Sequence, residues 1–258
     1  MSGYEFIETS VDNMTGVIEL NRPRQYNSIN RKMVSEILHA MQSFDQDDEV
    51  RVILIAGKGK AFSAGAEIDE MAEAESMSLE LLNQFEDWDR LALIKKPVIG
   101  AVHGFVFGGG FELALCCDVI LAAKGTEFSF PEVSLGVMPG AGGTQRLTKL
   151  VGRAKAIEWL WTGERISADE LLKYGAINRI VSPELLREEA LRFANRIAKM
   201  PPLSLRLIKD SVNKAVDYSL YEGMQYERKN FYLLFSSEDQ KEGMNAFIEK
   251  RKPNYKGK

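Results

Sequence analysis

Two glutamates that each stand beside glycine-rich backbone are the residues of this chain best suited to chemistry. Glu112 follows a run of three glycines at residues 108–110, and Glu132 precedes a second glycine-rich stretch at residues 139–143. Carboxylates are costly to bury unless they are paired, hydrogen-bonded or used in a reaction. Glycine-rich backbone lets a ligand come close to main-chain N–H groups. Proton carriers beside N–H donors for an oxyanion are what acid–base catalysis on a carbonyl compound requires.

Two segments offer candidate donors for that oxyanion. The pattern after residues 108–110 predicts a short buried helix, whose first N–H groups would be free to point at a carbonyl oxygen, with Glu112 in the first turn. The segment 60–67 follows an expected strand at 52–56, and its small residues also permit close approach of a ligand. The glycine run has a plainer interpretation, in which it only lets a helix pack tightly against a strand. The sequence leaves both interpretations open.

Other kinds of site fit the same residues less well. Residues 57–62 begin like the dinucleotide-binding pattern G-x-G-x-x-G, but Phe62 takes the place of the third glycine. Two carboxylates would also suit a glycosidase, which would leave the glycine-rich segments unexplained. His39 and His103 have no catalytic setting, and without a Cys/His cluster the sequence predicts no transition-metal site.

Composition limits the class of protein. With 258 residues and 45% hydrophobic content, the chain is long enough for one large core, with or without a small appended element. A net charge of −4, with 27% charged residues of both signs, gives no overall field for nucleic acid or an anionic membrane. The neighbouring Cys116 and Cys117 are expected to be free thiols of a reducing compartment. Without a signal-like start or a long apolar window, we expect a soluble cytoplasmic protein.

The apolar pattern predicts an α/β or mixed layered fold. Helical patterns separate short β-type runs, which are expected at residues 6–9, 16–20, 52–56, 98–102, 119–122 and 177–181. A helix with Asn30 as its N-cap is expected over residues 31–46, where apolar residues recur at helical spacing. Residues 70–94 are also expected to be helical, although their first half is acidic and irregular. Beyond residue 181 nearly the whole chain is expected to be helical.

Taken together, the motifs resemble the enoyl-CoA hydratase (crotonase) family. The segments that carry this resemblance, in order and spacing, are residues 21–23, 60–67, 108–114, 117–118, 131–147, 162–168 and 247–251. The resemblance implies an α/β fold, a crotonase-like spiral of ββα units with a helical C-terminal trimerisation region. Residues 1–200 would form the spiral core with the active site. Residues 201–258 would form the C-terminal helical oligomerisation region of a homotrimer or a dimer of trimers.

The resemblance also implies roles for particular residues. The backbone N–H groups of Ala66 and Gly109 correspond to the oxyanion hole for a thioester, and Gly140 corresponds to a glycine that positions the water. Glu112 and Glu132 match the acid–base pair: in the family's usual assignment Glu112 takes a proton from water and Glu132 supplies one to C2. The positions that match contacts to CoA are Arg24, Lys60, the carbonyl of Ala64, and Lys250, which would reach a CoA bound to a neighbouring subunit.

These matches predict an enoyl-CoA hydratase, which adds water to a trans-2-enoyl-CoA and gives a 3-hydroxyacyl-CoA. Retention of both glutamates favours hydration over Δ3-Δ2 isomerisation, the nearest alternative, because many relatives with other chemistry keep only one. An alternative of another class is an RNA-binding member of the family, which the acidic charge balance disfavours. The expected ligand is an acyl-CoA thioester, with no cofactor beyond the CoA of the substrate, no metal, no nucleic acid and no membrane.

Three positions depart from what is common in the family. Glu67 stands where aspartate is common, Phe111 where a smaller residue is common, and Phe130 where hydratases often have glutamine. Phe111 and Phe130 are expected to reshape the acyl pocket, and residues 68–88 are expected to wall it. The sequence does not specify the acyl chain length.

Overall fold

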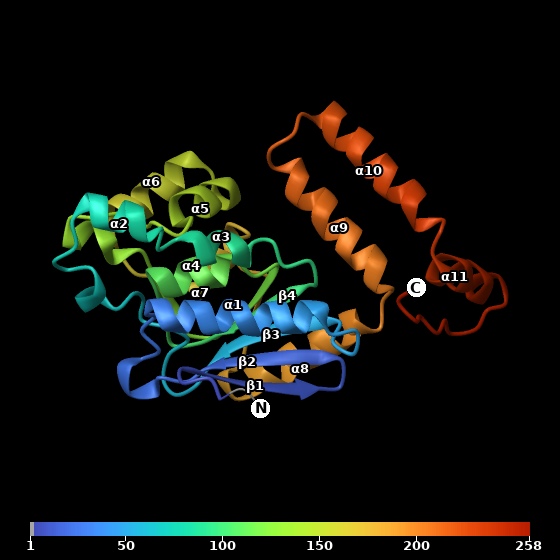
Figure 1. Cartoon of the computed structure of the whole chain (residues 1–258), viewed down its shortest axis with the longest axis horizontal. Helices are drawn as coiled ribbons and strands as arrows, with labels where there is room; N and C mark the ends of the chain where they lie inside the picture. The colour runs from blue at the N-terminus through green and yellow to red at the C-terminus, as the bar shows by residue number, and fades with distance from the viewer. Residues whose placement is uncertain (1–2) are drawn as a thin grey trace.

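The structure, a computed structural model, describes residues 3–258, which form two β-sheets and a series of helices (Figure 1). The larger sheet has six strands in the order β1-β2-β3-β4-β6-β9 and is parallel except for the β1–β2 pair. Its strands are β1 Ile7–Asp12, β2 Thr15–Leu20, β3 Val52–Gly57, β4 Val98–Val102, β6 Val119–Ala123 and β9 Arg179–Val181. The six expected runs correspond to these strands.

A smaller sheet of three short strands gives the fold its second layer. Its strands, in the order β5-β7-β8, are β5 Phe105–Phe107, β7 Glu127–Ser129 and β8 Ile166–Ser167. Strand β4 passes directly into β5, and β6 passes into β7, so that strands of the large and small sheets alternate along the chain. These three strands were not predicted from the sequence, because two or three residues are too few to show an alternating pattern.

Two helices cover the faces of the large sheet. Helix α1 (Arg31–Gln46) begins at Asn30, whose side chain accepts a hydrogen bond from the backbone N–H of Met33, as the sequence predicted. It packs with Ile53 and Ile55 in one core cluster. Helix α8 (Leu186–Ala198) covers the opposite face, where Val52 and Leu54 lie in a second cluster. Alternate residues of β3 therefore point to opposite faces and bury both of them.

The segment expected to be one helix over residues 70–94 is broken. It consists of the 3-10 turn η2 (Ile68–Glu70), helix α2 (Ser76–Leu82) and helix α3 (Glu86–Leu91). Helix α2 ends at Asn83, which adopts the left-handed conformation with φ 47°. The prediction of a continuous helix was wrong. Only Trp88 and Leu91 within these helices are buried, and the acidic first half has no apolar stripe that could pack against the core and stabilise a longer helix.

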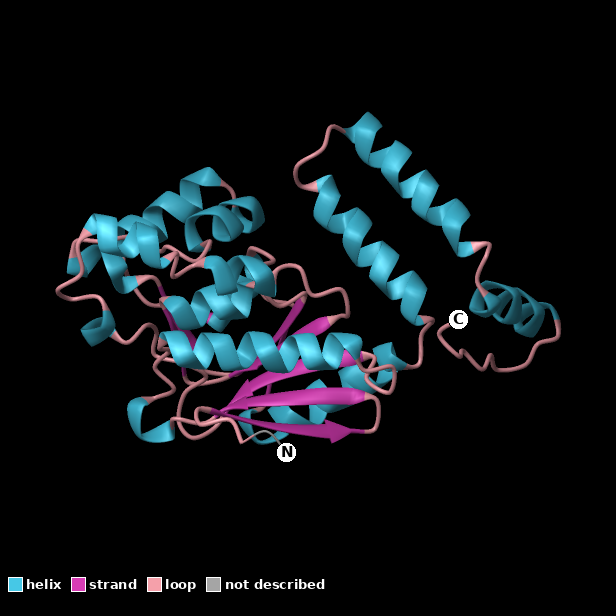
Figure 2. Cartoon of the chain, in the orientation of Figure 1, coloured by secondary structure: helices cyan, strands magenta, loops and turns pink. Residues whose placement is uncertain are grey.

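The four helices that link the sheets to the site are short. They are α4 Gly109–Leu115, α5 Gly143–Val151, α6 Arg153–Thr162 and α7 Ala168–Lys173. The chain then ends in three helices that reach away from the sheets, and Figure 2 shows that this extension contains no strand among the residues described. They are α9 Pro202–Ala215, α10 Leu220–Leu234 and α11 Glu238–Ile248.

The C-terminal extension touches the core at few points. Lys209 on α9 forms a 2.8 Å ion pair with Asp118, and Arg51 donates a hydrogen bond to the carbonyl of Tyr255. Every residue of α9 and α10 is at least partly exposed. The expected boundary near residue 200 falls just before α9. Among residues 3–258, no helix combines the length and the apolar character needed to cross a membrane.

Candidate active site

The passage from β5 into α4 depends on glycine at two positions. Gly108 has φ 47° and ψ −124°, a conformation that residues with a side chain rarely adopt. A Cβ atom at Gly110 would lie 2.6 Å from the Cβ of Ser63, so only glycine lets α4 approach the segment that follows β3. The packing interpretation of the glycine run is therefore right for Gly110, and it does not exclude a role for the N–H of Gly109.

The N–H groups of Ala66 and Gly109 lie close together. Ser63 pairs in parallel with Val106 of β5, so the segment after β3 runs beside the strand that leads into α4. A Cβ atom at Gly109 would stand 3.6 Å from the backbone nitrogen of Ala66. Neither N–H donates a hydrogen bond to another residue within 3–258. Both residues also line the same cavity, so the two N–H groups are placed as the donors of an oxyanion hole would be.

Glu112 is held by the loop that opens α5. The residue is 4% exposed, and its Oε1 accepts hydrogen bonds of 2.8 Å from the backbone N–H groups of Ala141 and Gly143. Burial raises the pKa of Glu112, while these two bonds and the charge of Arg146 act in the opposite direction. The two hydrogen bonds fix the carboxylate and offset part of the effect of its burial.

Glu132 has a different environment. It lies in the 3-10 turn η3 (Pro131–Leu135), and a Cβ atom at Gly108 would come within 2.8 Å of its Oε1. Its Oε2 is buried and has no hydrogen-bond partner among residues 3–258. Burial raises the pKa of Glu132 to about 7, and the nearby charge of Glu112 acts in the same direction. This carboxyl group is therefore suited to carry a proton near neutral pH and has a free oxygen for a ligand.

A cavity of about 280 Å³ opens in front of the donors. Ala66, Gly109 and Glu112 line it, whereas Glu132 lies outside its lining. The opposite wall comes from the start of α1 and from the predicted wall region, with side chains that include Ile29, Val34, Met71, Leu82, Phe85 and Trp88. The contribution of α1 was not predicted from the sequence, because no local pattern indicates which helix start will face a distant loop.

Gly140 lies against an aromatic ring of that wall. A Cβ atom at this position would come within 2.5 Å of the Cζ of Phe85, so the ring rests directly on the glycine backbone. Phe85 also lines the cavity and is 39% exposed. Any water held beside Gly140 would therefore share this space with the Phe85 ring.

Phe111 and Phe130 do not lie in the cavity wall, in contrast to the expectation from the sequence. They are 0% and 1% exposed and stack with their ring centroids 4.6 Å apart. A Cβ atom at Gly143 would lie 2.8 Å from the Cε1 of Phe130. Both rings belong to the core cluster, next to the loop that binds Glu112, and neither lines the cavity.

The comparisons with known proteins agree with this geometry. A family model described as enoyl-CoA hydratase/isomerase matches residues 11–258. This chain belongs to the enoyl-CoA hydratase/isomerase family. It is 44% identical to the mitochondrial enoyl-CoA hydratase of Pongo abelii over 95% of this chain and 84% of the relative. It is 42% identical to a probable enoyl-CoA hydratase of Mycobacterium tuberculosis over 98% of both chains.

Solved structures of the family share the fold. The crystal structure of an enoyl-CoA hydratase subunit from Geobacillus kaustophilus is 61% identical, covers 100% of both chains and superposes with a TM-score of 0.98. The prediction of an α/β crotonase-like spiral with a helical C-terminal region is thereby confirmed. The role of the C-terminal region in oligomerisation stays a prediction.

Three of the four residues matched to CoA contacts in this family lie on adjoining segments. Arg24, in the 3-10 turn η1 (Pro23–Gln25), and Lys60 and Ala64 are all exposed. The backbone N–H of Ala64 donates to the carbonyl of Tyr26, which joins the two segments. Lys250 follows α11, which belongs to the C-terminal extension that reaches away from the sheets in Figure 1.

Within residues 3–258, no three or more His, Cys, Asp or Glu side chains are grouped so that they could hold an ion. The two cysteines are free thiols.

Proposed function

We propose that this protein is an enoyl-CoA hydratase, which adds water to the double bond of a trans-2-enoyl-CoA and gives a 3-hydroxyacyl-CoA. The observation that carries the proposal is the pair of glutamates beside two free N–H donors. Glu132 has a buried, unpartnered carboxyl oxygen, and Glu112 is fixed by two backbone hydrogen bonds. A water molecule and a thioester supply the partners that these groups lack.

The proposed reaction begins with the thioester carbonyl between the N–H groups of Ala66 and Gly109. These donors polarise the conjugated double bond and stabilise the enolate-like charge that develops on the carbonyl oxygen. The oxygen of water then bonds to C3 while Glu112 takes one of its protons. Glu132 gives a proton to C2, so that one water has been added and the negative charge, which began on Glu112, ends on Glu132. Exchange with solvent restores the two protonation states.

The environments of the two glutamates support this division of roles. Two N–H donors favour the ionised form of Glu112, which a base requires. The pKa of Glu132, raised to about 7, keeps a proton available for transfer. The negative charge of Glu112 further raises the pKa of Glu132 and so favours its protonated form.

The dependence of kcat/KM on pH is expected to be bell-shaped. As the pH rises through about 7, Glu132 loses the proton that it must donate, so activity falls on the alkaline side. At lower pH, protonation of Glu112 removes the base, so activity falls on the acid side. Rates measured from pH 5 to pH 9 in wild type and in Glu132→Gln test this assignment. An alkaline limb that persists unchanged in Glu132→Gln would belong to another group.

Incubation of the purified protein with a panel of CoA esters tests the proposed reaction. We expect 2-enoyl-CoA esters to give products heavier by one water, and the set of accepted esters will define the preferred chain length. If 3-enoyl-CoA esters were instead converted to isomers of unchanged mass and 2-enoyl-CoA esters were not hydrated, the protein would be an isomerase. If no ester reacted and RNA shifted its electrophoretic mobility in a salt-dependent way, an RNA-binding role would replace both.

We also propose that residues 201–258 assemble a homotrimer or a dimer of trimers around the core formed by residues 1–200. Large apolar side chains of the extension are exposed, which favours burial against another subunit. Examples include Leu220, which is 81% exposed, Phe247, which is 84% exposed, and Ile248, which is 75% exposed.

We also propose a cytoplasmic location. The free thiols Cys116 and Cys117 fit this location, because a reducing compartment keeps thiols free.

Lys250 is proposed to complete the CoA site of a neighbouring subunit. Its replacement by alanine is expected to raise KM for a CoA ester more than for the matching pantetheine ester, which lacks the nucleotide that the ammonium group would contact. Steady-state kinetics with both esters measures this, light scattering measures the assembly, and Lys252→Ala serves as a control for loss of a nearby charge. A monomer that is fully active at nanomolar concentration, or an equal loss on both esters, would contradict the proposal.

A further inference from the structure

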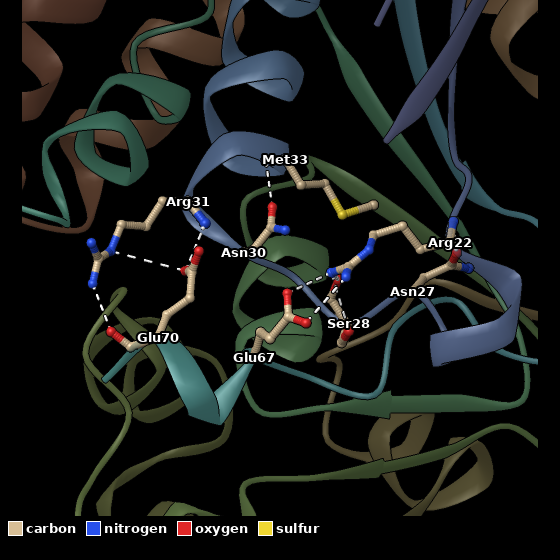
Figure 3. A network of polar contacts seen from close by, with 8 residues as sticks. All are labelled: Arg22, Asn27, Ser28, Asn30, Arg31, Met33, Glu67 and Glu70. Atoms are coloured by element: carbon tan, nitrogen blue, oxygen red, sulfur yellow. Dashed lines mark hydrogen bonds and ion pairs between the residues drawn. The ribbon is translucent and has the colours of Figure 1, made fainter. Parts of the chain in front are cut away.

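We propose that Arg22 and Glu67 form a clamp that positions the Ala66 N–H of the oxyanion hole, an inference that rests on the proposed hydratase function. Glu67 directly follows Ala66, and Arg22 reaches it from a segment 45 residues earlier in the chain. Figure 3 shows the guanidinium group of Arg22 facing the carboxylate of Glu67 beside the start of α1. Neither side chain needs to touch the reacting atoms for this role.

The direction of the Ala66 N–H is set by the peptide group to which it belongs. The carbonyl of Gly65, in the same peptide group, accepts a hydrogen bond of 2.7 Å from the N–H of Ile29. Because a trans peptide is planar and its C=O and N–H point in opposite directions, the Ala66 N–H must point away from Ile29. The next N–H, that of Glu67, donates to the carbonyl of Ile29 at 2.9 Å. The two hydrogen bonds with Ile29 therefore set the direction of the Ala66 N–H.

The pairing between Ile29 and the segment around Ala66 is short and needs reinforcement. Ile29 and Ala66 form an isolated bridge rather than part of a longer strand. Gly65, just before the donor, has φ 108° and no side chain to restrict its backbone. A small rotation about Gly65 would move the Ala66 N–H away from the substrate oxygen. Misplacement by about 1 Å is enough to lower the rate by about 10² when geometry controls a reaction.

The clamp joins the two sides of this bridge. The Nη1 of Arg22 lies 2.8 Å from the Oε2 of Glu67, and its Nη2 lies 3.1 Å from the Oε1. The same Nη1 donates to the carbonyl of Ser28 at 2.8 Å. Arg22 thus ties the residue after Ala66 to the residue before Ile29, and a planar guanidinium group is well suited to hold both in fixed geometry.

Arg22 is itself fixed to the core. Its backbone N–H donates to the side chain of Asn27, which is fully buried and donates in turn to the carbonyls of Lys58 and Ala61. Its guanidinium carbon lies 4.8 Å from the ring centroid of Phe6. The hydrogen bonds from Arg22 lower the pKa of Glu67, so the pair stays charged at neutral pH. The clamp therefore holds the donor segment against a rigid part of the molecule.

Two substitutions and their combination test the clamp. Glu67→Gln keeps the shape of the side chain but loses the paired charge, and Arg22→Lys keeps the charge but loses the two-pronged geometry. Each is expected to lower kcat for 2-enoyl-CoA hydration about tenfold with little change in KM, because a misaligned donor weakens transition-state stabilisation. The double variant is expected to lose about as much as either single variant, since the two residues act as one unit.

A spectroscopic measurement separates positioning from general structural damage. A cinnamoyl-CoA ester absorbs at longer wavelength when the oxyanion donors polarise its carbonyl, and the variants are expected to show a smaller shift on binding. Glu188→Gln, which removes a partner of Arg192 on the exposed face of α8, is the matched control and should leave both kcat and the shift unchanged. Thermal unfolding of all variants checks that they remain folded.

Two outcomes would overturn the clamp. One is wild-type kcat and a wild-type spectral shift in Glu67→Gln. The other is a rise in KM for Glu67→Gln with no effect of Arg22→Lys, which would make Glu67 a direct substrate contact, since it also lines the cavity. If wild-type protein bound the ester but hydrated nothing, the proposed function would fail, while the spectral shift would still test the clamp.

Discussion

Glu112→Gln and Glu132→Gln are each expected to lower kcat for hydration by at least about 10², with binding of acyl-CoA esters largely retained. Each substitution removes one proton carrier and keeps the shape of the side chain. In Glu112→Gln the amide oxygen of the new side chain would still accept the bonds from Ala141 and Gly143, so the loop before α5 should not move. Steady-state kinetics with a 2-enoyl-CoA ester measures the loss, and calorimetry with a saturated acyl-CoA measures binding.

A control variant and a stability measurement accompany the two glutamine variants. Glu158→Gln, which changes an exposed glutamate paired with Lys155, should behave as wild type. Glu132→Gln should be no less stable than wild type at pH 8. The folded-state pKa of Glu132, about 7, is above its ordinary value of 4.5, so the wild type loses stability as the pH rises through this interval and the half-buried carboxyl group ionises. Near-normal hydration by either glutamine variant would refute the two-glutamate mechanism.

Much of the fold can be predicted from the chain because its longer elements have clear patterns. Helix α1 has the expected bounds and N-cap, and its buried stripe is regular. The central strands β2, β3, β4 and β6 have apolar runs that are mostly buried. Strands β5, β7 and β8 were missed, since their two or three residues gain their structure from neighbours distant in sequence. Residues 70–94 were wrongly predicted as one helix. Their acidic first half has no apolar stripe, so its backbone conformation depends on local contacts that the sequence pattern does not show.

The site, like the fold, has parts that the sequence predicts and parts that it does not. Glu112, Glu132, Ala66 and Gly109 stand in short motifs, and the structure brings the two donors together and places both carboxyl groups beside them. The cavity wall was less predictable, since it depends on how the start of α1 meets the loop around Phe85. The positions of Phe111 and Phe130 were misjudged for a related reason.

Departure from a family pattern shows that a side chain differs in size, but not which face of a helix it occupies. Phe111 lies one residue before Glu112 on α4, and this single step turns its ring into the core while the carboxylate faces the cavity. The pairing of Arg22 with Glu67 is equally invisible in sequence, because opposite charges this far apart have many possible partners.

Gly109→Pro is expected to lower kcat/KM for hydration by about 10² to 10³, because it deletes one of the two N–H groups that stabilise the oxyanion. The change is suited to this position. Gly109 is the first residue of α4, where the N–H has no partner within the helix and proline is well tolerated. Circular dichroism and thermal unfolding establish first that the variant is folded.

Gly109→Ala is the matched control for the proline variant. The added Cβ atom would lie 3.6 Å from the nitrogen of Ala66 and 3.9 Å from the Cη2 of Trp88, which are ordinary contacts, and the N–H is kept. We therefore expect a much smaller loss in Gly109→Ala than in Gly109→Pro. Equal losses would mean that crowding at this position, rather than the missing donor, lowers the rate. A folded proline variant with normal turnover would place the oxyanion hole elsewhere, because one remaining donor at Ala66 does not provide the stabilisation of two.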